Sequence, residues 1–193
     1  VLYLTIVARS ITFSVKTLPK NQKYAPHIKS CSRKSPMRRF EIIADLFCHH
    51  DVEVCFALLG DANMHWAGAM HERGIKFIYP RHEHAAVAAA AAYTRSSGKT
   101  GCASVTCGPG LTQIMTILPI AVRANIPIVI FAGEAPLGKP WYNQMIDQAP
   151  FVQACGAKYC ALHDPYTIVE QINDAFRHAS ESWSPVVMGV PFD

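Results

Sequence analysis

Charged side chains are scarce in this sequence: Asp, Glu, Lys and Arg make up 17% of its 193 residues, whereas apolar residues make up 50%. A chain this apolar can bury a core, which excludes intrinsic disorder. The formal net charge is +4, yet residues 1–36 hold seven Lys and Arg residues and no acid. From Met37 onward acidic residues outnumber basic ones, so the globular part has no positive excess for a phosphate backbone. We therefore expect no nucleic-acid partner.

Cysteine motifs that bind metal are also missing. The seven cysteines stand at positions 31, 48, 55, 102, 107, 155 and 160, with no C-x-x-C pair and no histidine at zinc-finger spacing. Several lie in apolar runs, where a free cysteine is usually a small buried apolar side chain. This usage is typical of a reducing compartment, and we expect a cytoplasmic location. No segment approaches the ~20 uninterrupted apolar residues of a membrane span, so no membrane partner is expected.

The acid-free segment of residues 1–36 differs from everything that follows it. Three interpretations compete: a transit peptide, which would imply a mitochondrion or a plastid, a β-rich extension, and upstream sequence translated in frame. Val1 is not an initiator residue and Met37 stands directly before the first amphipathic segment, which favours the third interpretation. We therefore expect residues 1–36 to be a basic extension outside the fold and residues 37–193 to form the domain.

From Met37 the spacing of apolar residues alternates between the helical and the strand-like period. Helices are predicted over residues 38–49, 61–72, 83–97, 111–125 and 165–180, and an irregular stretch over 140–150. Strands are predicted over residues 53–59, 75–79, 102–106, 128–132, 158–162 and 186–190, and the second strand is expected to be buried. Asp61 is expected to cap the second helix, Pro119 to kink the fourth, and Gly133 to end the fourth strand. The pattern predicts an α/β fold with a six-stranded, mostly parallel sheet and helices on both faces.

Ligands of such sheets lie outside the carboxyl ends of the strands. Residues 59–61, 80–84 and 106–110 stand at three of these ends, and we expect them to be neighbours in space. The last segment contains Gly108-Pro109-Gly110 between a strand and a helix, where backbone N–H groups can meet an anion. It lacks the Lys of a P-loop, and Gln113 stands where G-x-G-x-x-G needs its third glycine. Taken alone, the motif favours a tight turn over a phosphate loop.

Glu83 follows a strand and opens a helix that consists largely of alanine. The helix dipole stabilises a carboxylate there, whereas a dry apolar setting disfavours its charge, so the two effects compete. The ordinary interpretation is a helix-capping glutamate. His82 and His84 flank it, but this spacing does not place three ligands on one metal, and we expect no zinc site.

The combination of these segments carries more information than each segment alone. It comprises residues 81–86 (Arg-His-Glu-His-Ala-Ala), 93–101, 105–110, 126–129 and Gly133, in this order. It resembles the pyrimidine-binding domain of thiamine-diphosphate enzymes of the acetolactate synthase and 2-oxo acid decarboxylase family, over about residues 37–193. The resemblance implies the thiamine-diphosphate-binding fold.

The resemblance also implies roles for single residues. In that family a glutamate bonds the N1′ atom of the cofactor's aminopyrimidine ring and favours its imino tautomer, and Glu83 takes this catalytic position. The family's glycine-proline-glycine turn contacts the same ring through its backbone and does not hold the diphosphate. The implied cofactor-binding residues are Gly60, Thr106, Gly108, Pro109, Gly110 and Gln113, and Gln144 is implied near the substrate.

Some of these positions depart from the family pattern. Gly60 ends Ala57-Leu58-Leu59-Gly60, where G-x-P-G is usual, and Gln113 stands in place of an asparagine. Around Gln144, Asn143 and Met145 replace the Phe and Glu of an F-Q-E-x-D segment.

The family's G-D-G…N-N motif, which fixes Mg²⁺ and the diphosphate in a second domain, has no counterpart here, so no metal ligand is expected in this chain. We expect half of an active site: the N-terminal domain of an acetolactate-synthase-like enzyme that decarboxylates or joins 2-oxo acids. Thiamine diphosphate would be shared with the diphosphate-binding domain of a partner subunit, in a homo- or hetero-oligomer. The isolated chain should be inactive. The alternatives are a complete subunit of a two-chain decarboxylase of the sulfopyruvate or phosphonopyruvate type, and a non-catalytic truncated paralogue.

Overall fold

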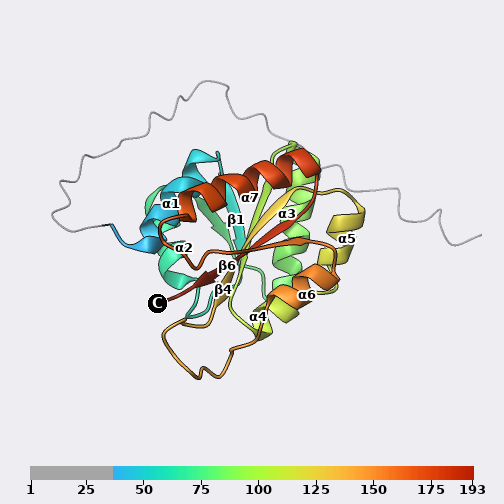
Figure 1. Ribbon diagram of the computed structural model, residues 1–193. Helices are drawn as coiled ribbons and strands as arrows, with labels where there is room; N and C mark the ends of the chain where they lie inside the picture. Colours follow the sequence, from blue (N-terminus) through green and yellow to red (C-terminus); the bar gives the residue numbers. More distant parts are fainter. Residues whose placement is uncertain (1–36) are drawn as a thin grey trace, which may run out of the picture. The chain divides into compact units, whose positions relative to one another are not determined.

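Six parallel strands form the centre of the computed structural model, which describes residues 37–193. The predicted basic extension, residues 1–36, lies outside the described residues. The strands are β1 (Val54–Ala57), β2 (Lys76–Ile78), β3 (Gly101–Val105), β4 (Ile128–Glu134), β5 (Lys158–Ala161) and β6 (Val186–Pro191). Their order is β2-β1-β3-β4-β6-β5, and all neighbouring pairs are parallel (Figure 1). The predicted α/β class is confirmed.

Helices cover both faces of this sheet. They are α1 (Arg39–His49), α2 (Met64–Glu72), α3 (Glu83–Ser97), α4 (Pro109–Thr112), α5 (Leu118–Arg123), α6 (Ala149–Ala154) and α7 (Ile168–Ser182). Among residues 37–193 none of them is long and apolar enough to cross a membrane. One core contains α1, α2 and α7, and the other contains α3 to α6, on opposite faces of the sheet (Figure 1).

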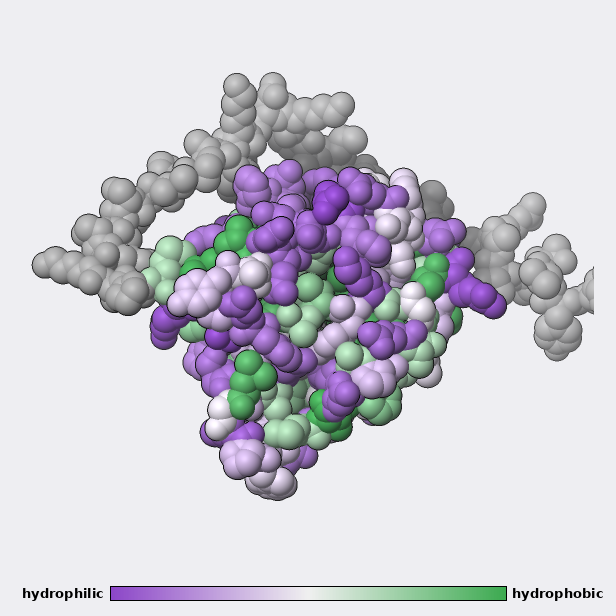
Figure 2. All heavy atoms as spheres, viewed as in Figure 1, coloured by the Kyte–Doolittle hydropathy of each residue, from purple (hydrophilic) through white to green (hydrophobic). Residues whose placement is uncertain are grey.

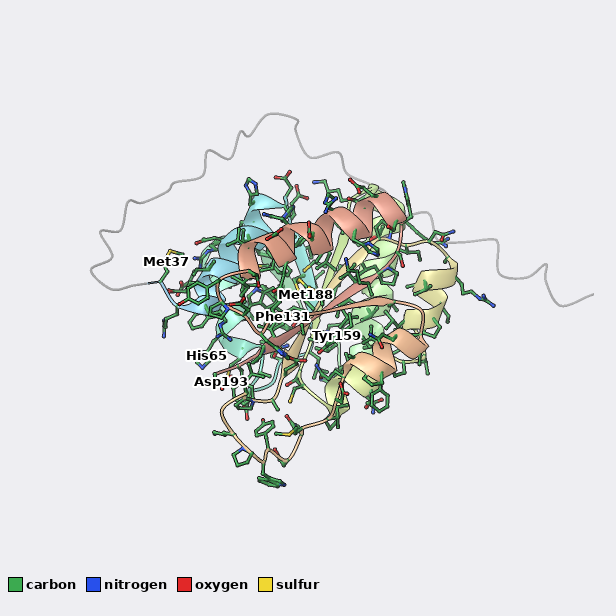
Figure 3. All side chains as sticks on the ribbon, viewed as in Figure 1. Met37, His65, Phe131, Tyr159, Met188 and Asp193 are labelled. Atoms are coloured by element: carbon green, nitrogen blue, oxygen red, sulfur yellow. The ribbon has the colours of Figure 1, made fainter. Side chains whose placement is uncertain are left out.

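Alternation along the strands explains the two cores, because successive strand residues point to opposite faces. Phe131 of β4 pairs with Met188 of β6, and both belong to the α1, α2 and α7 core (Figure 3). The preceding residue of each strand points to the other face: Ile130 and Val187 belong to the opposite core. The outer side of α7 is hydrophilic, as expected for a helix that buries one stripe (Figure 2).

The sheet reverses its direction of growth beside β1. The chain leaves β1 through α2 on one face to reach β2, then returns through α3 on the other face to reach β3 on the far side of β1. Such a switch point leaves a crevice at the carboxyl ends of the two strands that flank it, here β1 and β3. The order β2-β1-β3 confirms that residues 59–61, 80–84 and 106–110 follow neighbouring strands.

Three helix boundaries differ from the prediction. The second helix begins at Met64 and not at Asp61, because the intervening residues form a turn. The predicted helix over 111–125 is two helices, α4 and α5, and Pro119 lies in the first turn of α5, where its missing N–H costs no hydrogen bond. α7 begins at Ile168 rather than at Pro165.

Two further predictions need correction. α6 lies where an irregular stretch was expected to end, and β4 continues through Gly133 to Glu134, which pairs with Pro191. The second strand is not buried: β2 is an edge strand, with Ile78 40% exposed. A continuous apolar run does not show whether a strand lies at the edge of its sheet.

Candidate functional site

Four of the predicted site residues, Gly60, Glu83, Thr106 and Gly110, lie together beyond the ends of β1 and β3. A β-carbon placed on Gly60 would lie 2.6 Å from Oγ1 of Thr106, and one placed on Gly110 would lie 2.7 Å from Cγ2 of the same residue. The Thr106 side chain is therefore packed between two glycines that belong to different loops. Both glycines are required at this close approach because a larger residue would overlap Thr106.

Glu83 lies beside the same group. Its Oε1 is 3.5 Å from the position that a β-carbon on Gly110 would occupy. The capping role is filled by His82, whose Nδ1 accepts a hydrogen bond of 3.1 Å from the His84 backbone N–H. Within residues 37–193 the Glu83 carboxylate makes no hydrogen bond or ion pair with another side chain. Its oxygens thus remain available to a ligand.

The Thr106 hydroxyl is a second available group. Its Oγ1 is buried and has no hydrogen-bond partner in the described part of the chain. A buried hydroxyl without a partner costs free energy, so a native protein rarely leaves one unpaired. The Glu83 carboxylate and the Thr106 hydroxyl are therefore both unpaired at the same end of the sheet, which indicates a polar ligand.

Asn63 holds the loop that carries Gly60. Its Oδ1 accepts from the Gly60 N–H at 2.8 Å, while its Nδ2 donates to the Leu58 carbonyl at 3.0 Å and to Ser104 Oγ at 2.9 Å. Asn63 is only 1% exposed, so these bonds are buried and they tie the β1 loop to β3. The sequence analysis assigned no role to Asn63, because two of its three bonds are local and the third, to Ser104, joins segments 41 residues apart.

The Gly108-Pro109-Gly110 segment is a tight turn, as predicted. Gly108 has φ 58° and ψ −106°, a conformation available in practice only to glycine, and a β-carbon there would overlap the Gln144 carbonyl oxygen. Its N–H donates to Oε1 of Gln148 at 2.9 Å. Because that donor is used within the chain, the turn lacks the free N–H row of a phosphate loop.

Gln144 and Cys107 pack together on the outer side of this turn. The Cys107 thiol lies 3.6 Å from Oε1 of Gln144, which also accepts from the Tyr142 hydroxyl at 3.3 Å. Burial, with a smaller contribution from the charge of Asp61, raises the pKa of Cys107 to about 11. The thiol is therefore a neutral donor, and Gln144 contacts the turn.

Two predicted residues have weaker support. Pro109 is exposed and opens α4, and Gln113 is exposed at the end of α4. Within residues 37–193 the Gln113 side chain makes no hydrogen bond with the other candidates. No group of three or more His, Cys, Asp or Glu residues that could hold a metal ion occurs in that range.

A small cavity of about 60 Å³ lies elsewhere. It is bounded by α1, α2 and the end of β6, with His65, Phe131 and Asp193 in its wall (Figure 3). Neither Glu83 nor Thr106 lines it. The candidate site thus lies at the carboxyl ends of β1 and β3 and is separate from this cavity.

The family described as "Thiamine pyrophosphate enzyme, N-terminal TPP binding domain" matches residues 37–151. The 2-hydroxyacyl-CoA lyase 2 of Caenorhabditis elegans is 39% identical over 168 residues, which cover 83% of this chain and 26% of that protein. The protein of the same name from Xenopus laevis is 43% identical over 95 residues, 49% of this chain and 15% of that protein.

A mitochondrial acetolactate synthase of Schizosaccharomyces pombe is 31% identical over 158 residues, which cover 79% of this chain and 24% of that protein. The chain therefore spans about a quarter or less of the length of these three relatives.

Proposed function

The chain belongs to the family of N-terminal TPP binding domains of thiamine pyrophosphate enzymes, and from this premise we propose that its strand-end site binds the aminopyrimidine ring of thiamine diphosphate. The observation that carries the proposal is the pair of unpaired polar groups, the Glu83 carboxylate and the buried Thr106 hydroxyl, beside Gly60 and Gly110. An aminopyrimidine ring both donates and accepts hydrogen bonds, so this donor and acceptor set fits it.

Glu83 is the residue to which we assign proton chemistry. At the first position of α3 its carboxylate can accept a hydrogen bond from a ring nitrogen or hold the proton that the ring exchanges. In the following turns of α3, Ala86, Val87 and Ala90 are buried and apolar, so this face of the helix that Glu83 opens is dry. Thiamine diphosphate, when bound, supplies the electron sink for cleavage or formation of a bond next to a carbonyl carbon.

The Gly108-Pro109-Gly110 turn is assigned a positioning role. It brings the backbone of Gly110 next to Glu83 without any side chain between them. A flat ring can approach such a backbone closely, and the Thr106 hydroxyl beside it can supply one directed hydrogen bond. We assign the substrate-proximal role to Gln144, whose side chain contacts the same turn.

We propose that the diphosphate and Mg²⁺ are held by a further domain, contributed by another subunit. Exposed apolar side chains near the carboxyl ends of β1 and β2 support this: Leu59 is 39% exposed, Met64 49% and Tyr79 57%. A group of apolar side chains around a polar site is typical of a surface that another protein covers.

For the substrate class, we propose 2-oxo acids, which the chain would decarboxylate or join as part of an acetolactate-synthase-like enzyme. A second candidate is the cleavage of 2-hydroxyacyl-CoA. It is favoured by one observation: the identity with the 2-hydroxyacyl-CoA lyase 2 of C. elegans is 39%, against 31% with the S. pombe acetolactate synthase, at similar coverage of this chain. Both reactions use the same cofactor half-site, so they differ in the groups that the rest of the enzyme supplies.

Reconstitution tests the proposal. The chain is mixed with a separately expressed diphosphate-binding domain of a 2-hydroxyacyl-CoA lyase 2, and thiamine diphosphate with Mg²⁺ is titrated by calorimetry. Binding that requires both proteins supports the half-site, and product analysis with pyruvate or a 2-hydroxyacyl-CoA then separates the two substrate classes. Binding without turnover would favour the non-catalytic paralogue, and a complex in which the ring is not held near Glu83 would refute the site.

We also propose a reducing compartment, with the cytoplasm as the first candidate and a mitochondrion or plastid as the alternative if residues 1–36 are a transit peptide. All six cysteines of the described range are free, including Cys55 and Cys102 on the adjacent strands β1 and β3. Imaging of the tagged natural reading frame tests the location.

A further inference from the structure

A chain of directed hydrogen bonds runs from the edge of the sheet to the backbone of Gly108. Glu134, at the end of β4, accepts from the hydroxyl of Tyr159 on β5. The Tyr159 oxygen accepts from Nε2 of Gln148 at 3.2 Å, and Oε1 of Gln148 accepts from the Gly108 N–H at 2.9 Å. Four residues that are distant in sequence are thus joined in one row.

The direction of every bond in this row is determined by chemistry. Burial, and then the hydrogen bond to the Glu134 carboxylate, raise the pKa of Tyr159, so its hydroxyl keeps its proton and donates it to Glu134. The lone pair of that hydroxyl is then left for Nε2 of Gln148. With its nitrogen turned to Tyr159, Gln148 must present its oxygen to Gly108.

The row is also packed tightly. A β-carbon on Gly189 of β6 would overlap the Tyr159 hydroxyl and would lie 2.6 Å from Oε1 of Glu134. Gln148 is 2% exposed, so water does not compete for its two hydrogen bonds.

Gly108 is the position that needs such support. Its backbone angles, φ 58° and ψ −106°, lie outside the preferred regions, and a glycine in this conformation has many alternatives. Gln148 holds its N–H, while the Gln144 backbone lies against its α-carbon. The segment before α6 therefore holds the turn at Gly108.

We propose that Gln148 is a positioning residue of the cofactor half-site: through its bond to the Gly108 N–H, and oriented by Tyr159, it sets the Gly108-Pro109-Gly110 turn in the geometry that receives the aminopyrimidine ring. This role rests on the proposed function of the turn. It assigns Gln148 and Tyr159 an indirect role, which they exert through the Gly108 N–H.

The first experiment needs no cofactor. Backbone amide exchange of the ¹⁵N-labelled chain is measured by NMR for the wild type, for Gln148→Met, which keeps the size but loses both bonds, and for Gln153→Met, the same change at an exposed position of α6. We expect the Gly108 amide to exchange about three- to tenfold faster in Gln148→Met, the ratio for one neutral hydrogen bond. The exchange rate of the Ile130 amide in the core should not change. In Gln153→Met the exchange rate of the Gly108 amide should equal that of the wild type.

Tyr159→Phe tests the role of the row without touching Gly108. It removes the acceptor that orients Gln148, so we expect a smaller rise of Gly108 exchange than in Gln148→Met. In the double variant the two effects should not add, because both act through one bond. Tyr166→Phe, at a position 95% exposed, is the control. Unchanged Gly108 exchange in both single variants, or an equal rise at Ile130, would overturn the positioning role. If Gln148→Met folds poorly, unchanged Gly108 exchange in Tyr159→Phe alone overturns it.

The second experiment adds the partner domain used for reconstitution. We expect Gln148→Met to weaken thiamine diphosphate binding about tenfold, while the control variant binds as the wild type does. If the wild type itself binds no cofactor, the proposed function is wrong, whereas the row of hydrogen bonds is unaffected by that result. If the wild type binds and Gln148→Met binds equally well despite a released Gly108 amide, the inference is wrong and the proposed function stands.

Discussion

The hydroxyl oxygen of Thr106 lies 2.6 Å from the point that a β-carbon on Gly60 would occupy. The two residues follow neighbouring strands, β1 and β3, at the switch point of the sheet. The hydroxyl is buried against a backbone that offers it no hydrogen bond. The contact therefore brings two loops together and leaves a polar atom for a ligand.

Gly60→Ala should destabilise the fold by about 1–3 kcal/mol, because the new methyl group overlaps the Thr106 side chain in a packed site. The measurement is urea unfolding. Gly68→Ala is the matched control: no atom lies within 4 Å of its β-carbon position, and an alanine inside α2 should stabilise by about 0.5–1 kcal/mol. Similar free energies of unfolding for the two variants would contradict the close approach.

Gly108→Ala should be more damaging than Gly60→Ala. It combines a positive φ with overlap of the Gln144 carbonyl oxygen, which is backbone and cannot turn away. Gly98→Ala isolates the first effect, because Gly98 has φ 73° and open space around it, and should cost about 1 kcal/mol. The measurement is thermal unfolding. An equal loss of stability in Gly108→Ala and Gly98→Ala would mean that segment 141–148 does not pack on the turn.

Glu83→Gln should abolish cofactor activation in the reconstituted complex and leave the fold intact. Glutamine can still hydrogen-bond a ring nitrogen, but it cannot exchange a proton with it. The readout is hydrogen–deuterium exchange at thiazolium C2.

Glu170→Gln, in the first turn of α7, is the control for that change, since both variants lose a carboxylate near a helix dipole, worth about 0.3–1 kcal/mol. Wild-type exchange at C2 in the Glu83→Gln complex would show that Glu83 has only a structural role.

The isolated chain should bind thiamine diphosphate weakly and should not turn over pyruvate, because we assign the diphosphate and Mg²⁺ contacts to another domain. Calorimetry with Mg²⁺ present measures the affinity, and submicromolar binding would contradict that assignment. Light scattering of the same sample should show self-association through the apolar side chains near the site. A stable monomer at high concentration that binds no apolar dye would count against a covered surface.

The Cys107 thiol should make the stability of the chain depend on alkaline pH. Its pKa is about 11 in the folded chain against 9.0 for an ordinary thiol, so the folded state holds the proton more firmly than the unfolded state. Its contribution is therefore full below pH 9 and is lost as the pH rises towards 11. Cys107→Ala should flatten this part of the curve of unfolding free energy against pH, measured by urea denaturation. Parallel curves would show that the thiol is not buried.

Local interactions explain what could be predicted from the sequence. α3 has the predicted bounds, Glu83 to Ser97, because alanine favours the helix and Gly98 ends it with a positive φ. Pro119 lies in the first turn of α5, after the point where the predicted helix divides, since proline lacks the N–H that a helix interior needs. The family resemblance, carried by short motifs, is confirmed by the match over residues 37–151.

The predictions that were wrong depend on contacts between segments that are far apart in the sequence. α2 begins later than predicted because residues 61–63 form a turn, in which the Asn63 side chain bonds Ser104, 41 residues away. β2 is exposed because it is the first strand in the sheet order, which no apolar run encodes.

The sequence alone determined the alternation of helices and strands, since each element depends on neighbours a few residues away. Only the tertiary structure decided that Thr106 is packed between Gly60 and Gly110, that Glu83 is left unpaired beside them, and that Gln148 reaches Gly108. These are contacts between segments dozens of residues apart. They depend on the order of strands in the sheet and on the buried side chains that fill the gaps between loops. The spacing of apolar residues along the sequence predicts neither.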